Sequence, residues 1–165
     1  MSDAPPINGV RAIIAVLGAL VLFSVLSQVL EASLVRAVGG EGMTNLDAYF
    51  AVLTRPPMLM AKAAINVVVG LLTGYLAGKI AGTRETTFAG IAAAAESCSL
   101  AWGFMTGEYV ILPLWTRILL LVITGPAMVA GAWVRMQARL AMESTPEPPP
   151  AAGPTAGPSA DRETP

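Results

Sequence analysis

The stretch that decides the fold is "AIIAVLGALVLFSVLSQVL", residues 12–30, which lies between Arg11 and Glu31 and contains no charged residue. A helix needs about 20 predominantly apolar residues to cross the roughly 30 Å hydrocarbon core of a membrane, and this stretch suffices. A cleaved signal peptide is the alternative, but the apolar region is longer than a signal peptide requires and no clear cleavage site follows it. We therefore predict an uncleaved membrane-spanning helix.

Three further stretches have the same character, so the predicted fold class is an all-α membrane protein with four transmembrane helices in an antiparallel bundle. The spans are predicted over about 11–35, 58–81, 86–106 and 110–135. The only charged residue inside the third span is Glu96, and the only one in the apolar part of the fourth is Arg117. Helices of a soluble bundle would each show a charged face, and these do not.

A short helix over about 44–54 is predicted between the first two spans. Thr44 or Asn45 can cap it, and apolar residues then recur at helical spacing, at Leu46, Tyr49, Phe50 and Leu53. The favoured interpretation is a helix on the outer membrane surface, with its aromatic residues at the interface. The alternative is a lid over a cavity or a docking site for another protein.

The chain divides into three parts. Residues 1–9 are predicted to form a cytoplasmic N-terminal tail, and residues 10–140 the four-helix transmembrane domain. Residues 141–165 are predicted to be a disordered cytoplasmic tail, because seven of the 22 residues from Ser144 onward are proline.

Loop charges predict the orientation. With the N-terminus inside, the cytoplasmic flanks carry five basic residues, Arg11, Lys79, Arg84, Arg135 and Arg139. The outer flanks carry three, Arg36, Arg55 and Lys62. Cytoplasmic loops carry the excess of Lys and Arg, so both termini are predicted to be cytoplasmic. The excess of Arg over Lys in an Ala-, Gly- and Pro-rich chain favours a bacterial source, and therefore a multi-pass protein of the inner membrane.

Glycines recur at every fourth position of the second span, at Gly70, Gly74, Gly78 and Gly82. Helices in lipid associate through close backbone approach, and a ridge of this kind permits it. The third span offers a matching small surface, made of Gly90, Ala93, Ala94, Ser97 and Ala101. We predict that the glycine ridge packs against the third span, with homodimerisation through the same ridge as the alternative.

Polar residues inside the spans form a candidate intramembrane cluster of Glu31, Lys62, Asn66, Glu96 and Arg117. The first span adds a polar stripe at helical spacing, Ser24, Ser27, Gln28 and Glu31. Charges inside a membrane usually face the bundle interior and find partners. We predict the pairs Glu31 with Lys62 and Glu96 with Arg117. The alternatives are a polar ligand or ion site, and, for Arg117, a side chain that reaches the outer interface.

The strings "GYLAGKIAG" (74–82), "PLW" (113–115) and "GAWVR" (131–135) resemble a loose pattern in small uncharacterised bacterial four-span inner-membrane proteins. The resemblance covers residues 10–140 and implies no activity. Small multidrug-resistance transporters also have four spans and an intramembrane glutamate. Their acid lies in the first span, whereas Glu96 lies in the third.

The composition excludes several classes of function. The chain has no histidine, one cysteine and a formal net charge of −1. Histidine is the commonest general base and metal ligand, and a nucleic-acid-binding protein shows a basic surface. We therefore predict no catalytic, cofactor-binding or metal site and no nucleic-acid partner. The predicted partners are the lipid bilayer and either a second copy of the chain or another membrane protein.

The function predicted from the sequence is that of a non-catalytic packing scaffold or accessory subunit in the membrane. The alternative is a small oligomeric transporter or channel that uses the intramembrane polar cluster. A membrane enzyme is disfavoured, because the usual hydrolase and metalloprotease motifs are missing from the sequence.

Overall fold

The protein is an all-helical integral membrane protein. A computed structural model describes residues 9–39, 45–82, 84–106 and 111–144. Its helices are α1 (Gly9–Ala37), α2 (Leu46–Leu53), α3 (Pro56–Ala81), α4 (Glu85–Thr106) and α5 (Leu114–Glu143). All but α2 are long and apolar enough to cross a membrane. The predicted fold class of four spans, with a short helix between the first two, is confirmed.

The last helix differs most from its predicted bounds. It begins at Leu114 and continues to Glu143, whereas the prediction ended it near residue 135. Within the extension, the guanidinium of Arg139 pairs with Glu143 one turn later at 3.2 Å. Such pairs stabilise a helix where it has left the apolar region. Residues 141–143, predicted to belong to a disordered tail, are therefore helical, and the prediction for residues 145–165 lies outside the described residues.

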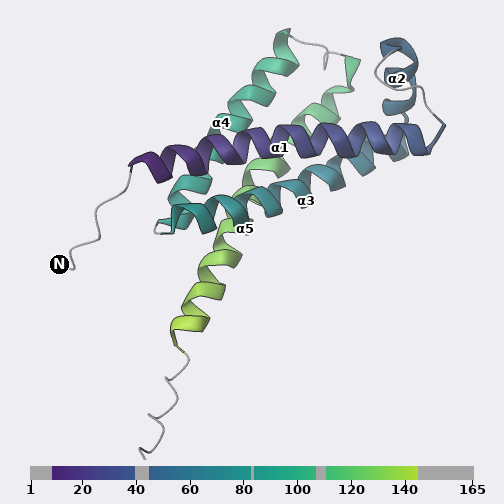
Figure 1. The fold of residues 1–165 in the computed structure, drawn as a ribbon. Coiled ribbons are helices and arrows are strands. Elements are labelled where there is room, and N and C mark those ends of the chain that lie inside the picture. The colour runs from purple at the N-terminus through teal and green to yellow at the C-terminus, as the bar shows by residue number, and fades with distance from the viewer. Residues whose placement is uncertain (1–8, 40–44, 83, 107–110, 145–165) are drawn as a thin grey trace, which may run out of the picture.

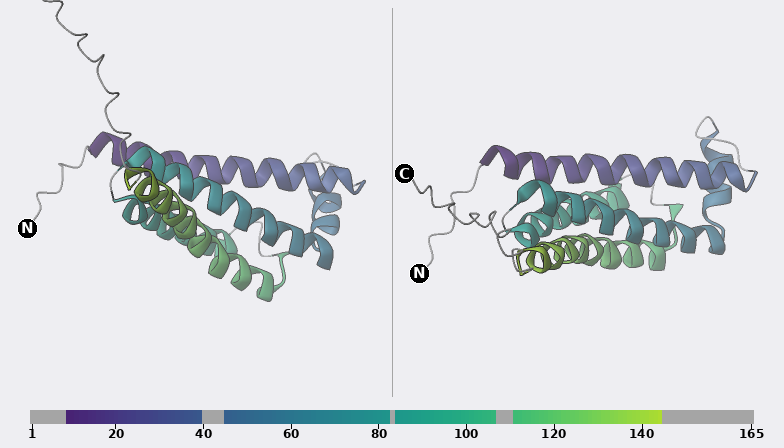
Figure 2. Two further views of the ribbon diagram at one scale, coloured as in Figure 1. Left: turned by 90° about the horizontal axis from the view of Figure 1, so that it is seen from below. Right: turned by 60° about the horizontal axis from the view of Figure 1, so that its bottom comes forward.

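The four long helices form an antiparallel bundle in which α3 and α5 make the most extensive contact (Figure 1). α1 packs chiefly on α3, α4 packs chiefly on α5, and α1 and α4 touch each other much less. The start of α1 and the end of α5 lie at one end of the bundle, which we call the terminal end. The opposite end carries α2 and is called the α2 end (Figure 2).

At the α2 end, α2 lies crosswise to α1 (Figures 1 and 2). Asn45 caps this helix, since its side-chain oxygen accepts a hydrogen bond from the Ala48 amide at 3.2 Å. Tyr49 was predicted to lie at the membrane interface but is only 3% exposed. It belongs to an apolar cluster of Val35, Tyr49, Val52, Leu53, Met58, Leu59, Ala63, Leu112 and Leu120. The cluster fixes α2 over this end of the bundle.

The glycine ridge of α3 packs against α5, so the prediction that it packs against the third span is wrong. A methyl group on Gly74 would overlap the backbone carbonyl of Met128. A methyl group on Gly131 of α5 would overlap the backbone of Leu71 in the same way. Glycines on both helices therefore let the two backbones touch. Gly82 ends the helix at a positive φ of 72°, and a methyl group there would meet no atom within 4 Å.

Candidate functional site

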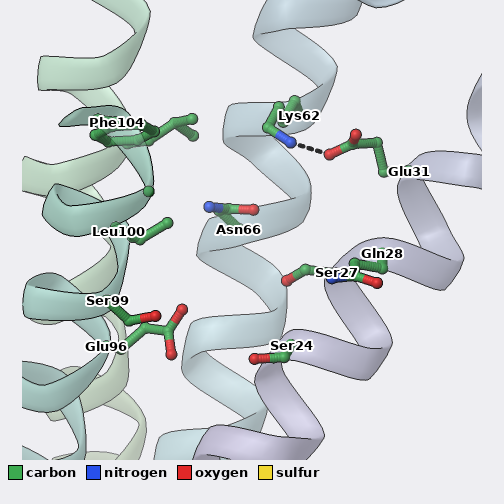
Figure 3. A pocket seen from close by; sticks show the side chains of 12 residues that line it. Ser24, Ser27, Gln28, Glu31, Lys62, Asn66, Glu96, Ser99, Leu100 and Phe104 are labelled. Carbon is green, nitrogen blue, oxygen red and sulfur yellow. Dashed lines mark hydrogen bonds and ion pairs between the residues drawn. The ribbon is translucent and has the colours of Figure 1, made fainter. Parts of the chain in front are cut away.

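A polar cavity of about 190 Å³ lies between α1, α3 and α4, in the half of the bundle nearer the α2 end (Figure 3). It is lined by Ser24, Ser27, Gln28, Glu31, Lys62, Asn66, Glu96, Ser99, Leu100, Gly103, Phe104 and Leu120. The lining contains the whole polar stripe predicted on the first span. It also contains every residue of the predicted intramembrane cluster except Arg117.

Helical spacing explains why these side chains meet. Residues three, four and seven positions apart lie on one face of a helix. The α1 residues follow this spacing from Ser24 to Glu31, and Lys62 and Asn66 are one turn apart on α3. On α4 the corresponding set is Glu96, Ser99 and Gly103. Each helix therefore presents one polar or small face to a common space.

Glu31 and Lys62 form the predicted ion pair across the α1–α3 contact, and the prediction is confirmed. Both side chains are buried, at 9% and 6% exposure of the residue. The second carboxylate oxygen of Glu31 accepts a hydrogen bond from the hydroxyl of Tyr49 at 2.6 Å. Sequence reasoning did not find this third partner, although a buried tyrosine hydroxyl usually has one. Both oxygens of Glu31 are thus occupied.

Asn66 is oriented by α5. Its amide nitrogen donates to the Thr124 hydroxyl at 3.4 Å, and that hydroxyl donates to the Leu120 carbonyl at 2.7 Å. Thr124 was not predicted as a site residue, because one threonine in an apolar helix ordinarily bonds only to its own backbone. No other hydrogen bond of Asn66 occurs among the described residues. The side-chain carbonyl of Asn66 is therefore left as an acceptor beside the cavity.

Glu96 is the unusual member of the cavity. It lies in the middle of α4, is 6% exposed, and makes no hydrogen bond or ion pair with any residue that the structure describes. Figure 3 shows its carboxylate and the hydroxyl of Ser24 directed into the same space from α4 and α1. A carboxylate in this position would ordinarily be paired.

The predicted pair of Glu96 with Arg117 does not form. The Arg117 Nε donates to the carbonyl of Leu112 at 2.8 Å, and its Nη1 donates to the carbonyl of Phe104 at 3.4 Å. Because α5 begins at Leu114, Arg117 lies in its first turn, near the α2 end. Glu96 lies ten residues before the end of α4, or ~15 Å along the helix axis. Arg117 is therefore engaged with the backbone at the α2 end, and Glu96 is left without a cation.

The charged side chains that line the cavity do not balance, because one carboxylate has no basic partner there. The Lys62 ammonium offsets the Glu31 carboxylate, and no other basic side chain lines the cavity. The ionised form of Glu96 would therefore leave one net negative charge in the cavity. The remaining polar groups are hydroxyls and amides, which can accept or donate hydrogen bonds. The site is suited to a cation or a proton and not to an anion.

A second ionic cluster lies outside the cavity, at the terminal end. Glu85, which is 2% exposed, accepts a hydrogen bond from the Nε of Arg139 at 3.2 Å. This contact joins the first turn of α4 to the last turns of α5. Arg139 was predicted only as a basic residue of a cytoplasmic flank and Glu85 was not singled out, because sequence alone does not show that the two helix ends adjoin.

Comparison with known proteins gives no relative: no family model, no curated protein and no solved structure matches the chain.

Proposed function

We propose that the protein is a small membrane transporter that binds a cationic solute in the cavity between α1, α3 and α4, with Glu96 as the counter-charge. The observation that carries this function is the buried, unpaired carboxylate of Glu96 in the middle of a membrane span. A charge at this depth costs about 2.5–3.5 kcal/mol on insertion scales, and ionisable residues there commonly mark an ion or substrate path. A purely structural acid would be expected to have a partner, as Glu31 does.

The packing of the bundle closes the cavity toward the terminal end. Toward the terminal end, the cavity is followed by a tight cluster of Ala19, Ala77, Ala92, Ala93 and Met128. We propose that a solute passes this cluster when α1 and α4 separate. These two helices touch each other much less than each touches its main neighbour. Movement between them would open the cavity toward the terminal end while the glycine-packed α3–α5 pair stays intact. Rocking of one part of a bundle against another is the motion by which many transporters alternate access.

The test is uptake of radiolabelled methylammonium, together with proton flux, by liposomes containing the purified protein. We expect flux above that of empty liposomes. In Glu96→Gln we expect the flux to fall by a factor of about ten or more, because the bound cation loses its buried counter-charge and removing one partner of such a pair costs about 2–5 kcal/mol. The matched control is Glu143→Gln, which removes a carboxylate that is 58% exposed at the end of α5. Equal flux in Glu96→Gln and wild type, or no flux of either cation in the wild type, would contradict the transport function.

A scaffold or accessory-subunit role, predicted first from the sequence, is the second candidate. It is favoured by α1, where only Ala15, Ala19, Phe23, Glu31 and Val35 are buried among 29 residues. Much of this helix is thus available to another membrane protein or to a second copy, as well as to lipid. Normal behaviour of Glu96→Gln together with a stable co-purifying partner would favour this role. Neither candidate includes a catalytic step or a cofactor.

For the orientation, we propose that the terminal end faces the cytoplasm. The terminal end carries Arg11, Lys79, Arg84, Arg135 and Arg139. The α2 end carries Arg36, Arg55 and Arg117, besides the buried Lys62. The excess of basic residues at the terminal end supports this orientation, because cytoplasmic flanks carry more Lys and Arg.

Cysteine labelling tests this orientation. With Cys98→Ser as background, a cysteine at position 42, introduced as Gly42→Cys, is expected to react in intact cells with a maleimide that does not cross membranes. A cysteine introduced at the terminal end, as Arg84→Cys, is expected to react only after the cells are opened. The reverse pattern of labelling would invert the proposed topology.

A further inference from the structure

The cavity opens sideways, toward the surrounding lipid, between α1 and α4. Ser24 and Gln28 on α1 and Ser99 on α4 line it, and all three residues are exposed. Ser24 lies near the middle of α1, so this polar residue is exposed at the depth at which hydrocarbon would surround the helix. Exposed polar groups at that depth are costly unless something satisfies them.

The direct route from the α2 end is covered by the described residues. The Glu31–Lys62 pair lies between the cavity and the apolar cluster under α2, and Tyr49 bridges α2 to that pair. A solute arriving along the bundle axis would have to break this contact. The opening between α1 and α4 requires no such change.

The same contact line between α1 and α4, which we call the seam, has an apolar hollow nearer the terminal end. This hollow measures about 330 Å³ and is lined by Ala12, Ile13, Val16, Leu17, Phe88 and Ile91. Leu17 and Gln28 are eleven residues apart on α1, and so are Phe88 and Ser99 on α4. Eleven residues are about three helical turns, so the apolar hollow and the polar opening lie on the same faces, ~16 Å apart along the bundle.

From this arrangement we infer that the occupant is an amphipathic ammonium compound that enters from the bilayer. Its charged head lies at Glu96, among the hydroxyls of Ser24 and Ser99, and its apolar chain follows the seam into the hollow at Leu17 and Phe88. A single-chain amine fits better than a phospholipid, because the unpaired carboxylate of Glu96 would repel a phosphate. Lys62, the basic side chain that lines the cavity, is already paired with Glu31. This inference rests on the proposed function, since both use Glu96 as the counter-charge.

The experiment measures binding of radiolabelled decylammonium and of methylammonium to the full chain in phosphatidylcholine nanodiscs, with empty nanodiscs subtracted. We expect the apparent dissociation constant of decylammonium to be at least about tenfold lower than that of methylammonium. Unlabelled decanol, which has the chain without the charge, should not compete. Glu96→Gln should abolish specific binding of both amines.

Two variants fill the apolar hollow without touching the charged site. Leu17→Trp and Ile91→Trp enlarge residues that line it and are 56% and 50% exposed. Each variant should weaken the binding of decylammonium until its dissociation constant equals that of methylammonium. The dissociation constant of methylammonium should not change. The matched control is Val21→Trp, which also introduces a tryptophan on α1. Val21 lines a different hollow, the one between α1 and α3.

The two possible failures are distinguishable. If methylammonium and decylammonium bind equally well and both depend on Glu96, the seam is not used, so this inference is overturned while the proposed function stands. If neither amine shows binding that depends on Glu96, the proposed function fails as well. If the nanodisc particles contain two copies and Leu17→Trp reduces them to one, a second copy covers the seam, which also overturns the inference.

Discussion

Lys62→Met is expected to destabilise the folded protein by about 3–5 kcal/mol, because it leaves the buried carboxylate of Glu31 without its cation. Methionine occupies a volume similar to that of the lysine stem, so the packing against α1 changes little. The hydroxyl of Tyr49 remains as a hydrogen-bond donor to Glu31 but brings no positive charge. The measurement is the unfolding midpoint of purified protein in mixed micelles titrated with a denaturing detergent, supported by the amount that accumulates in membranes.

The double variant Glu31→Gln/Lys62→Met distinguishes two quantities: the destabilisation caused by a buried carboxylate without its cation, and the net contribution of the ion pair to stability. Replacing both partners of a buried ion pair is often close to neutral, so we expect most of the lost stability to return. Lys79→Met is the matched control, since Lys79 lies exposed near the end of α3 and should change stability little. A double variant as unstable as Lys62→Met, or a Lys62→Met protein of normal stability, would show that charge compensation does not hold α1 to α3.

Much of the site could be predicted because its geometry is local to each helix. The spacing from Ser24 to Glu31 places four polar side chains on one face, whatever that face contacts. The pair Glu31–Lys62 follows from the position of each residue in its span: Glu31 lies six residues before the end of α1 and Lys62 six residues after the start of α3, which places both at one depth. These features need no knowledge of how the other helices are arranged.

The partner of the glycine ridge could not be predicted in this way. Glycine at every fourth position shows which face of α3 is small, but α4 and α5 both carry small residues. The structure brings Ala127, Gly131 and Ala132 of α5 to that face. The choice between two small surfaces depends on the packing of the whole bundle and not on any one segment.

Arg117 shows why charge balance alone was misleading. Two acids and two bases suggest two ion pairs, but a guanidinium can equally use backbone carbonyls, and the last four carbonyls of a helix lack partners within that helix. Phe104 lies in the last turn of α4 and its carbonyl is such an acceptor. Once Pro113 sets the start of α5, Arg117 is closer to these acceptors than to Glu96. The structure thereby turns an expected structural pair into an unpaired acid that faces a cavity.

Gly74→Leu is expected to be the most damaging change in the α3–α5 contact. The first side-chain atom would already overlap the backbone of Met128, which cannot move aside as a flexible side chain could. Overpacking a core costs typically about 1–3 kcal/mol and more where the backbone must shift, so we expect a loss of at least ~3 kcal/mol. Leucine is a better helix former than glycine by up to about 1 kcal/mol, so the measured loss is a lower bound on the cost of the clash. The same detergent titration gives the unfolding midpoint.

Gly90→Leu is the informative control, because Gly90 belongs to the α4 surface that was predicted from the sequence to pack against the glycine ridge. In the structure a methyl group on Gly90 would meet no atom within 4 Å, so the variant gains helix propensity without a clash. We expect it to be as stable as the wild type or slightly more stable. Strong destabilisation by Gly90→Leu would restore α4 as the partner. A Gly74→Leu protein that stays folded but changes from dimer to monomer would instead show that the ridge joins two copies, and the close α3–α5 contact would have to be abandoned.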